Sequence, residues 1–255
     1  MRSLYNHPKY YDLAFSYRNI TSEVDTIEKC IKIYSKVPVQ TVLELGCGSC
    51  PHMLEIVKRG YTYVGIDINP RMIQYSLEKA YNHQDKVKLV QASMVDFELD
   101  HQVDFVCTML GSLYVQNTEQ LISHFHSVSK ILKSGGLYFL DWCVDFSPLT
   151  DVSDYWTTED SLLNIFTEVN YRLRLHNIVE QLYTETVDVK VTENGRVRKF
   201  RESHLRRAIY PQEFVLASTK LSPFELVGWW NNWNLNKPLT GKERNVRPMI
   251  LLRRL

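Results

Sequence analysis

Short apolar runs alternate with amphipathic segments along the first 142 residues of the chain. The runs have the length of buried strands, and the segments between them repeat their apolar positions as helices do. The predicted strands cover residues 41–45, 63–67, 87–92, 105–110 and 137–142. One helix is expected over residues 21–36, with Thr21 or Ser22 as its N-cap, and a long one over residues 119–132. Strands that alternate with helices predict a parallel sheet with right-handed crossovers.

The pattern changes to a period of two after Pro148. Residues 161–208 alternate apolar and polar positions, and Asn194-Gly195 supplies a hairpin turn. These features predict a three-stranded antiparallel sheet inserted into the α/β domain. A helix over residues 210–220 and two closing strands, 224–230 and 248–252, would complete the parent sheet.

The predicted fold class is therefore α/β, with a Rossmann-like sheet and an antiparallel insertion towards the C-terminal half. We expect an N-terminal helical cap, a cofactor-binding Rossmann-like domain, a β insertion over the active site and a return to the first sheet. These segments cover residues 1–40, 41–158, 159–208 and 209–255 respectively.

The most informative stretch is Val42–Gly48, in which an apolar run ends at Glu44, Gly46 and Gly48. A second run ends about twenty residues later at Asp67, an acid placed to hold both ribose hydroxyls of a nucleoside. Pro51 replaces the third glycine of the dinucleotide fingerprint, so a nucleoside without phosphates fits better. The natural candidate is S-adenosylmethionine. The alternative is that the two glycines only form a tight turn between strand and helix.

Composition restricts the remaining possibilities. The chain has 30 basic and 29 acidic residues and a net charge of +1, so no nucleic-acid partner is expected from its charge. No apolar run reaches the ~20 residues of a membrane helix, and the N-terminus lacks an apolar signal core, so we expect a cytoplasmic protein without membrane partners. Cys47 and Cys50 form a C-x-x-C motif near His52, but no second pair completes a zinc site, so no metal is expected.

These motifs resemble those of class I S-adenosylmethionine-dependent methyltransferases, most closely the small-molecule branch with the amino-sugar N-methyltransferases of antibiotic biosynthesis. The resemblance covers nearly the whole chain. It includes Glu-Leu-Gly-Cys-Gly (44–48), Val-Gly-Ile-Asp (64–67), Ala-Ser-Met-Val-Asp-Phe (92–97) and Leu-Lys-Ser-Gly-Gly (132–136). Sugar N-methyltransferases of this branch have a histidine shortly after the fourth strand. This chain has Leu113-Tyr114-Val115 there, so the resemblance does not extend to an amino-sugar acceptor.

The resemblance implies a set of cofactor-binding residues. The glycines would pass beneath the methionine part, Asp67 would hold the ribose, Met94 would flank the adenine, and Arg18 would pair with the carboxylate. Ser93 stands where members often carry an aspartate for the adenine amino group. The full set is Arg18, Glu44, Gly46, Gly48, Asp67, Ile68, Ser93, Met94 and Leu110.

The expected reaction is in-line transfer of the methyl group to a nitrogen or oxygen of a small polar acceptor. Tyr11, Tyr17 and Tyr114 are the candidates for positioning the acceptor, and His52 is the candidate base if the acceptor is a hydroxyl. Two alternatives stay open: a protein or nucleic-acid substrate, and a cofactor-binding partner subunit without catalysis. The first would use the basic residues Arg196, Arg198, Lys199, Arg201, Arg206 and Arg207. Nothing in the sequence indicates an oligomeric state.

Overall fold

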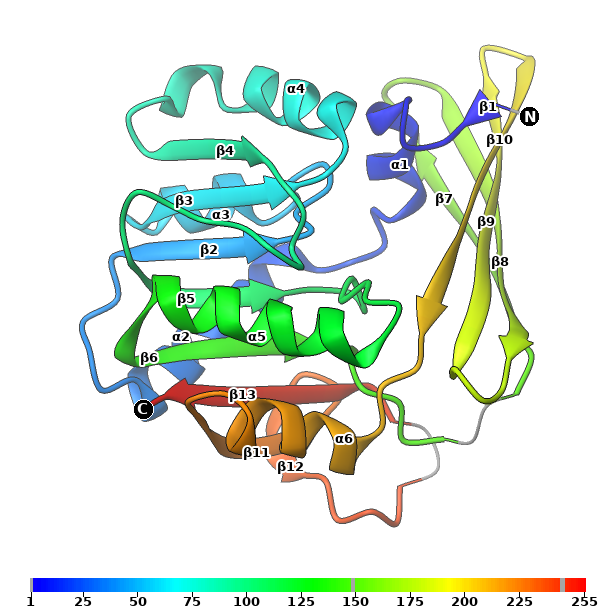
Figure 1. Cartoon of the computed structure of the whole chain (residues 1–255). Helices are drawn as coiled ribbons and strands as arrows, with labels where there is room; N and C mark the ends of the chain where they lie inside the picture. Colours follow the sequence, from blue (N-terminus) through cyan, green and yellow to red (C-terminus); the bar gives the residue numbers. More distant parts are fainter. Residues whose placement is uncertain (1, 148–149, 244–245) are drawn as a thin grey trace.

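The computed structural model describes residues 2–147, 150–243 and 246–255 and contains two sheets (Figure 1). The main sheet has eight strands in the order β12-β11-β13-β6-β5-β2-β3-β4. They are β2 (Thr41–Leu45), β3 (Thr62–Asp67), β4 (Val87–Gln91), β5 (Val103–Thr108), β6 (Leu132–Asp141), β11 (Phe224–Asn231), β12 (Asn234–Pro238) and β13 (Pro248–Arg254). Strands β2 to β6 pair in parallel, whereas β13 and β11 run antiparallel. The predicted Rossmann-like sheet, including its two closing strands, is confirmed.

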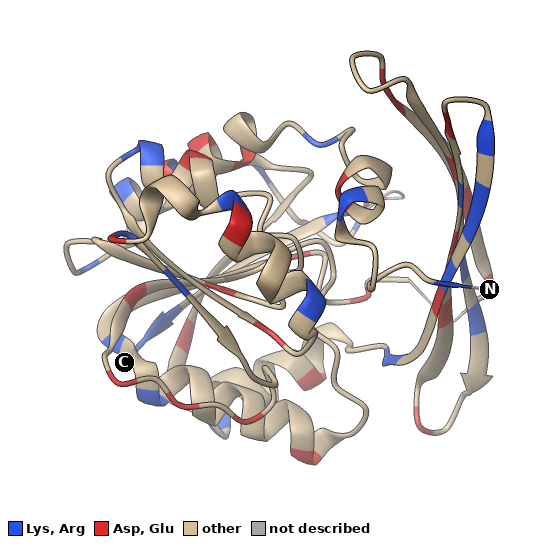
Figure 2. Cartoon of the chain, turned by 90° about the horizontal axis from the view of Figure 1, so that it is seen from above, with Lys and Arg blue, Asp and Glu red and all other residues tan. Residues whose placement is uncertain are grey.

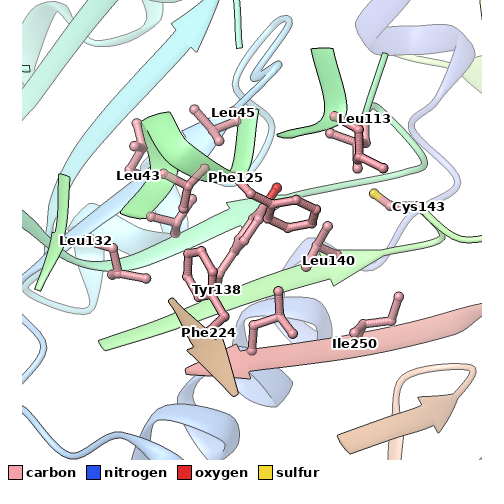
Figure 3. Packing of buried hydrophobic residues seen from close by; sticks show 14 of the residues in the cluster. Leu43, Leu45, Leu113, Phe125, Leu132, Tyr138, Leu140, Cys143, Phe224 and Ile250 are labelled. Atoms are coloured by element: carbon pink, nitrogen blue, oxygen red, sulfur yellow. The ribbon is translucent and has the colours of Figure 1, made fainter. Parts of the chain in front are cut away.

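Helices cover both faces of the main sheet because each presents one apolar stripe. They are α2 (Ile20–Tyr34), α3 (Met53–Lys58), α4 (Pro70–Lys79), a 3₁₀ turn (Tyr81–His83), α5 (Thr118–Ile131), and α6 (Pro211–Val215) followed by a π turn (Leu216–Lys220). On one face, Phe125 of α5 and Phe214 of α6 pack with Tyr138 and Leu140 of β6; Figure 3 shows Phe125 among its neighbours. On the other face, α2 and α3 bury Ile27 and Ile56.

Asparagine side chains start three of these helices. Asn19 caps α2 by accepting from the backbone N–H of Ser22, and Asn69 and Asn117 do the same for α4 and α5. The expectation of Thr21 or Ser22 as the cap of α2 is therefore wrong by two or three residues. An asparagine carbonyl caps as well as a serine hydroxyl, so sequence alone does not separate these neighbours. Among the described residues, no helix is long and apolar enough to cross a membrane.

The second sheet has the order β1-β10-β9-β8-β7. Its strands are β1 (Arg2–Ser3), β7 (Val152–Asp160), β8 (Ile165–Asn177), β9 (Leu182–Glu193) and β10 (Arg196–Arg207). The inserted antiparallel sheet is confirmed, but it has four strands, β7 to β10, not three, and β1 from the N-terminal segment joins β10 in parallel. The predicted three correspond to β8, β9 and β10. Strand β7 was missed because it is an edge strand that exposes most of its residues and so carries little apolar alternation, and β1 has only two residues.

The second sheet stands across the carboxyl ends of the parallel strands, with helix α1 (Pro8–Ala14) between it and the main sheet (Figures 1 and 2). Leu4 and Ala14 join Val169, Val189 and Phe200 in a separate apolar cluster that attaches the N-terminal segment to this sheet. Residues Asn194 and Gly195 both have positive φ, as the predicted hairpin turn between β9 and β10 requires. The carboxyl ends of the parallel strands are thus enclosed by α1 and the second sheet.

Candidate active site

The turn after β2 approaches its neighbours too closely for side chains. Gly46 has φ +64°, and a Cβ built there would lie 2.6 Å from Met94 Cε and 3.3 Å from Ser112 Cβ. Gly48 has φ +53°, and its backbone N–H donates to Asp67 Oδ2 over 2.8 Å. The positive φ favours glycine at both positions, and at Gly46 the lack of space for a side chain favours it as well.

Asp67 ends β3 beside this turn. Its Oδ1 accepts from the backbone N–H of Asn69 at 2.8 Å, so each carboxylate oxygen has one partner. A carboxylate offers about four acceptor positions, which leaves capacity for two hydroxyl groups. Burial raises the pKa of Asp67, while the two backbone N–H groups oppose that rise.

A cavity of about 230 Å³ lies between this turn, helix α1 and the end of β5. Six of the predicted site residues line it: Tyr11, Arg18, Glu44, Gly46, Gly48 and Leu110. Met109 and Ser112 close the side towards β5, and Asp12 and Phe15 contribute from the N-terminal segment. The other predicted cofactor-binding residues, Asp67, Ile68, Ser93 and Met94, are not among those that line it.

Below the cavity is a buried network that the sequence did not indicate. His52 is fully buried, with Nδ1 2.9 Å from Glu44 Oε1 and Nε2 2.9 Å from Glu23 Oε2. Arg18 donates through Nε and Nη2 to Glu23, and Tyr63 donates to Glu44 at 2.8 Å. Burial acts to lower the pKa of His52, but the charge of Glu44 and hydrogen bonds to both carboxylates raise it to about 9. His52 is therefore a charged residue that holds two carboxylates in place.

The prediction of His52 as a base facing the acceptor does not fit this placement. Both ring nitrogens are occupied by carboxylates, and the ring is shielded from solvent. The pairing of Arg18 with a cofactor carboxylate stays a prediction: Arg18 lines the cavity but is itself held by Glu23.

The loop after β4 packs against the glycine turn that follows β2. The side chain of Met94 packs against Gly46, Ser93 Oγ accepts from the backbone N–H of Val95, and Ile68 is 70% exposed. His124 fixes this loop, because its Nδ1 lies 2.8 Å from the carbonyl of Met94. Burial lowers the pKa of His124 to about 4, so the neutral ring donates from Nδ1 and accepts at Nε2 from Tyr138.

The turn after β5 is strained and strongly anchored. Leu110 has φ +52°, which is uncommon for a residue with a branched side chain, and Gly111 follows at φ +69°. The backbone N–H of Leu110 donates to Asp141 Oδ2 at 3.0 Å. Arg247 grips both oxygens of the same carboxylate, at 2.9 Å and 2.7 Å, and its guanidinium lies over the rings of Trp142 and Trp233. The strain is thus held by an ion pair between the buried Asp141 and the partly exposed Arg247, next to the cavity-lining Leu110.

The predicted tyrosines occupy different places. Tyr11 lines the cavity, whereas Tyr17 is not among its lining residues and is 53% exposed with its ring against Trp156. Tyr114 points instead to the second sheet and donates to Glu185 Oε2 at 2.6 Å. Glu185 and His204 were not identified from the sequence, and Arg206 was named only as part of the basic stretch in residues 196–207. The available signal was Glu185 itself, a charged residue in phase with the buried Tyr183, Val187 and Val189 of β9.

Cys47 and Cys50 are buried thiols within the turn. Among the described residues, no group of three or more His, Cys, Asp or Glu side chains is arranged to hold a metal ion.

Comparison with known proteins agrees with this geometry. A family model described as "Methyltransferase domain" matches residues 42–136, which run from β2 into β6. Residues 42–136 of the chain thus resemble a methyltransferase domain. The matched residues include the glycine turn, Asp67, Met94 and Leu110, all of which belong to the predicted cofactor site. The sequence-based resemblance to methyltransferases is thereby confirmed.

Curated relatives match over a limited part of their length. The cypemycin N-terminal methyltransferase of Streptomyces sp is 30% identical over 107 residues, 42% of this chain and 42% of that protein. The chain spans less than half the length of each curated relative that it matches at this level.

Solved structures cover the whole methyltransferase fold. An S-adenosylmethionine-dependent methyltransferase from Clostridium acetobutylicum superposes with a TM-score of 0.77 at 18% identity, over 96% of this chain and 95% of that one. An amino pentose methyltransferase from Micromonospora echinaspora, solved with S-adenosylmethionine, gives a TM-score of 0.73 at 16% identity, over 96% and 97%. At such identities the likeness establishes the fold, including the second sheet outside the matched domain.

Proposed function

We propose that the chain transfers a methyl group from S-adenosylmethionine to a nitrogen of a small polar molecule. The observation that carries this proposal is the cavity at the carboxyl ends of β2 and β5, bordered by the glycine turn whose N–H binds Asp67. The proteins of similar fold include methyltransferases of sugars and glycopeptides, and their names state nitrogen as the acceptor atom.

The residues of the cavity fit this cofactor. Gly46 and Gly48 leave room for the methionine chain, and Asp67 keeps acceptor capacity for the ribose hydroxyls. Arg18 is an anchored cation for the carboxylate, and the backbone and side chains of residues 93–94 would border the adenine. The bound sulfonium supplies an activated methyl group, so the protein has mainly to align the acceptor and exclude water.

A nitrogen acceptor is favoured over oxygen because the histidine predicted to deprotonate an alcohol is not among the residues that line the cavity. His52, the candidate for that role, is enclosed by Glu44 and Glu23. A neutral amine needs no such help, because its lone pair is already available.

A nucleic-acid substrate is less well supported. Three residues of the basic stretch in β10 are neutralised within the fold: Arg198 pairs with Glu193, Arg201 with Asp188, and Arg207 with Glu213. Phosphate contacts would have to break these pairs. A cofactor-binding subunit without catalysis is the remaining alternative, and turnover separates it from the enzyme.

Titration calorimetry with S-adenosylmethionine and S-adenosylhomocysteine tests the proposal. Asp67→Ala should weaken binding by a few kcal/mol, since hydrogen bonds to charged groups contribute ~1.5–3 kcal/mol each. Asp85→Ala is a matched control, because Asp85 is exposed on a turn far along the chain from the cavity-lining residues. Unchanged binding by Asp67→Ala contradicts the cofactor site. Tight binding without methyl transfer to any acceptor would favour the non-catalytic alternative.

A further inference from the structure

A second polar cluster lies between the end of β5 and the inner side of the second sheet. Glu185 of β9 is at its centre and has a 7% exposed side chain. Tyr114, from the loop after β5, donates to Glu185 Oε2 at 2.6 Å, and Tyr171 of β8 donates to Oε1. The main sheet and the second sheet are thus joined through one buried carboxylate.

This cluster borders the cavity of the methyltransferase domain. A Cβ on Gly111 would lie 3.7 Å from both terminal nitrogens of Arg206, and Gly111 stands between Leu110 and Ser112, which line the cavity. On the other side, the ring of Tyr5 lies 5.5 Å from that of Tyr11, another lining residue, and 5.8 Å from that of His204. A molecule held by this cluster would therefore adjoin the cavity assigned to the cofactor.

The hydrogen-bond directions in the cluster select the kind of ligand. Both tyrosine hydroxyls donate their hydrogen bonds to Glu185, so they can only accept hydrogen bonds from a ligand. Burial raises the pKa of Tyr114, which keeps it neutral, whereas for Glu185 the neighbouring donors and Arg206 overcome burial and lower the pKa to about 2. The cluster holds two carboxylates, Glu185 and Asp145, against one guanidinium, Arg206. This arrangement favours a ligand that is a cation and a hydrogen-bond donor.

His204 supplies a group that can take a proton. Its Nε2 lies 3.3 Å from Glu185 Oε2, and its ring packs edge-on against Tyr114 with centroids 4.8 Å apart. A carboxylate beside Nε2 favours the tautomer with the proton on that nitrogen, which leaves a lone pair on Nδ1. Glu185, Tyr114 and Tyr5 contact His204. Tyr171 and Arg206 act on Glu185, Asp145 lies beside Arg206, and Glu202 lies beside Tyr5. Its side chain is 26% exposed, so the ring is reachable from the space in front of it.

We propose that this cluster is the acceptor site, that the acceptor is a primary or secondary amine bound as its ammonium ion, and that His204 is the general base. The proposal rests on the proposed function. Tyr114 and Tyr171 accept from the ammonium, and Glu185 compensates its charge. One ammonium proton passes to His204 Nδ1, and the nitrogen keeps the electron pair of that N–H bond. This pair then forms the N–C bond to the methyl group of the sulfonium donor, while the electrons of the C–S bond stay on sulfur.

The test uses the full chain with S-adenosylmethionine and probe amines, each paired with the alcohol of the same skeleton. Suitable pairs are D-glucosamine with D-glucose, alanylglycine with lactylglycine, and tyramine with tyrosol. Release of S-adenosylhomocysteine and the mass of the product are measured. Methylation of at least one amine and of no alcohol is the expected result. Methylation of an alcohol, or of no probe amine by protein that binds the cofactor normally, overturns the proposal.

With the best amine, His204→Gln should lower kcat at pH 7 by ~10²–10⁴-fold, the usual range for loss of a general base. The loss should shrink as the pH approaches the pKa of free alkylamines, ~10, because a larger fraction of the acceptor is then already deprotonated when it binds. Imidazole should restore activity to His204→Ala. A merely structural role would produce neither the pH trend nor the rescue.

Two controls separate failure of this proposal from failure of the proposed function. S-adenosylhomocysteine binding should stay within about twofold of the parent in His204→Gln and Glu185→Gln, since neither residue lines the cofactor cavity. His176→Gln changes an exposed histidine on β8 of the same sheet and should leave kcat unchanged. Loss of cofactor binding in the parent would refute the proposed function itself. A His204→Gln kcat like that of His176→Gln would refute only the base.

Discussion

His52 Nδ1 lies 2.9 Å from Glu44 Oε1, and this buried contact ties the residue that precedes α3 to strand β2. Glu44 lines the cavity, and the same imidazole holds Glu23, which in turn holds Arg18. One histidine thus helps to position the carboxylate of Glu44 and the guanidinium of Arg18, which both line the cavity. It does so without reaching that space.

We expect His52→Ala to lower the free energy of unfolding by ~3–5 kcal/mol, because it leaves two buried carboxylates without their shared partner. Urea denaturation measures this, and calorimetry should show weaker cofactor binding as Glu44 and Arg18 lose their support. His101→Ala, at an exposed turn, is the control and should change neither quantity. Parent-like stability of His52→Ala would show that the network contributes nothing.

The same pair predicts a pH dependence of stability. The pKa of His52 is raised from its ordinary 6.5 to about 9, since Glu44 and Glu23 outweigh burial and the charge of Arg18. Its contribution, on the order of 3 kcal/mol, is therefore complete below pH 6.5 and is lost as the pH rises through about 9. Unfolding of the parent and of His52→Gln should differ most near pH 6 and converge by pH ~10. A constant difference across this range would contradict a charged His52.

The glycine turn offers a second, independent test. Gly46→Ala places a methyl group 2.6 Å from Met94 Cε at φ +64°, so it combines backbone strain with a steric conflict. Gly195→Ala is the matched control: φ is +74° there, but no atom lies within 4 Å of the new Cβ. Both should lose ~1–2 kcal/mol of stability from the left-handed backbone. Only Gly46→Ala should also weaken S-adenosylhomocysteine binding, by about tenfold or more, which is ~1.4 kcal/mol. Equal effects of the two substitutions would remove the steric argument.

The parts that could be predicted from the sequence are those encoded in local patterns. The parallel strands are apolar runs, and Gly46, Gly48 and Asp67 are set by the geometry of one βαβ unit. The contacts of His52 and Glu185 could not be predicted, because each depends on partners from other elements. Glu23 lies 29 positions from His52, and Tyr114 lies 71 positions from Glu185.

Strand β7 shows the complementary limit. It pairs with β8 along one edge, and no strand of the described residues pairs with the other. Most of its side chains are exposed, so its sequence lacks the alternation of a half-buried strand. Its Trp156 nevertheless donates to the carbonyl of Ala14 and fixes α1 against the sheet. An alternating sequence pattern reveals a strand only when one of its faces is buried. Strand β7 is mostly exposed, and its contacts with β8 and α1 stabilise it instead.

The last prediction concerns the strained turn at Leu110. Asp141 is fully buried and accepts from Leu110 N–H and from two nitrogens of Arg247, so the guanidinium fork fixes the carboxylate that fixes the turn. Arg247→Lys keeps the charge but cannot form the bidentate contact. It should lower the free energy of unfolding by ~1–3 kcal/mol and weaken S-adenosylhomocysteine binding, because Leu110 borders the cavity.

Arg174→Lys is the matched control for this substitution. Arg174 also pairs with an aspartate, Asp151, but both side chains are about half exposed, and such pairs contribute ~0–1 kcal/mol. Denaturation and calorimetry on the two variants therefore compare a buried fork with a surface pair of the same chemistry. If Arg247→Lys binds the cofactor as tightly as Arg174→Lys, the ion pair stabilises the fold without shaping the site, and the positive φ of Leu110 needs another explanation.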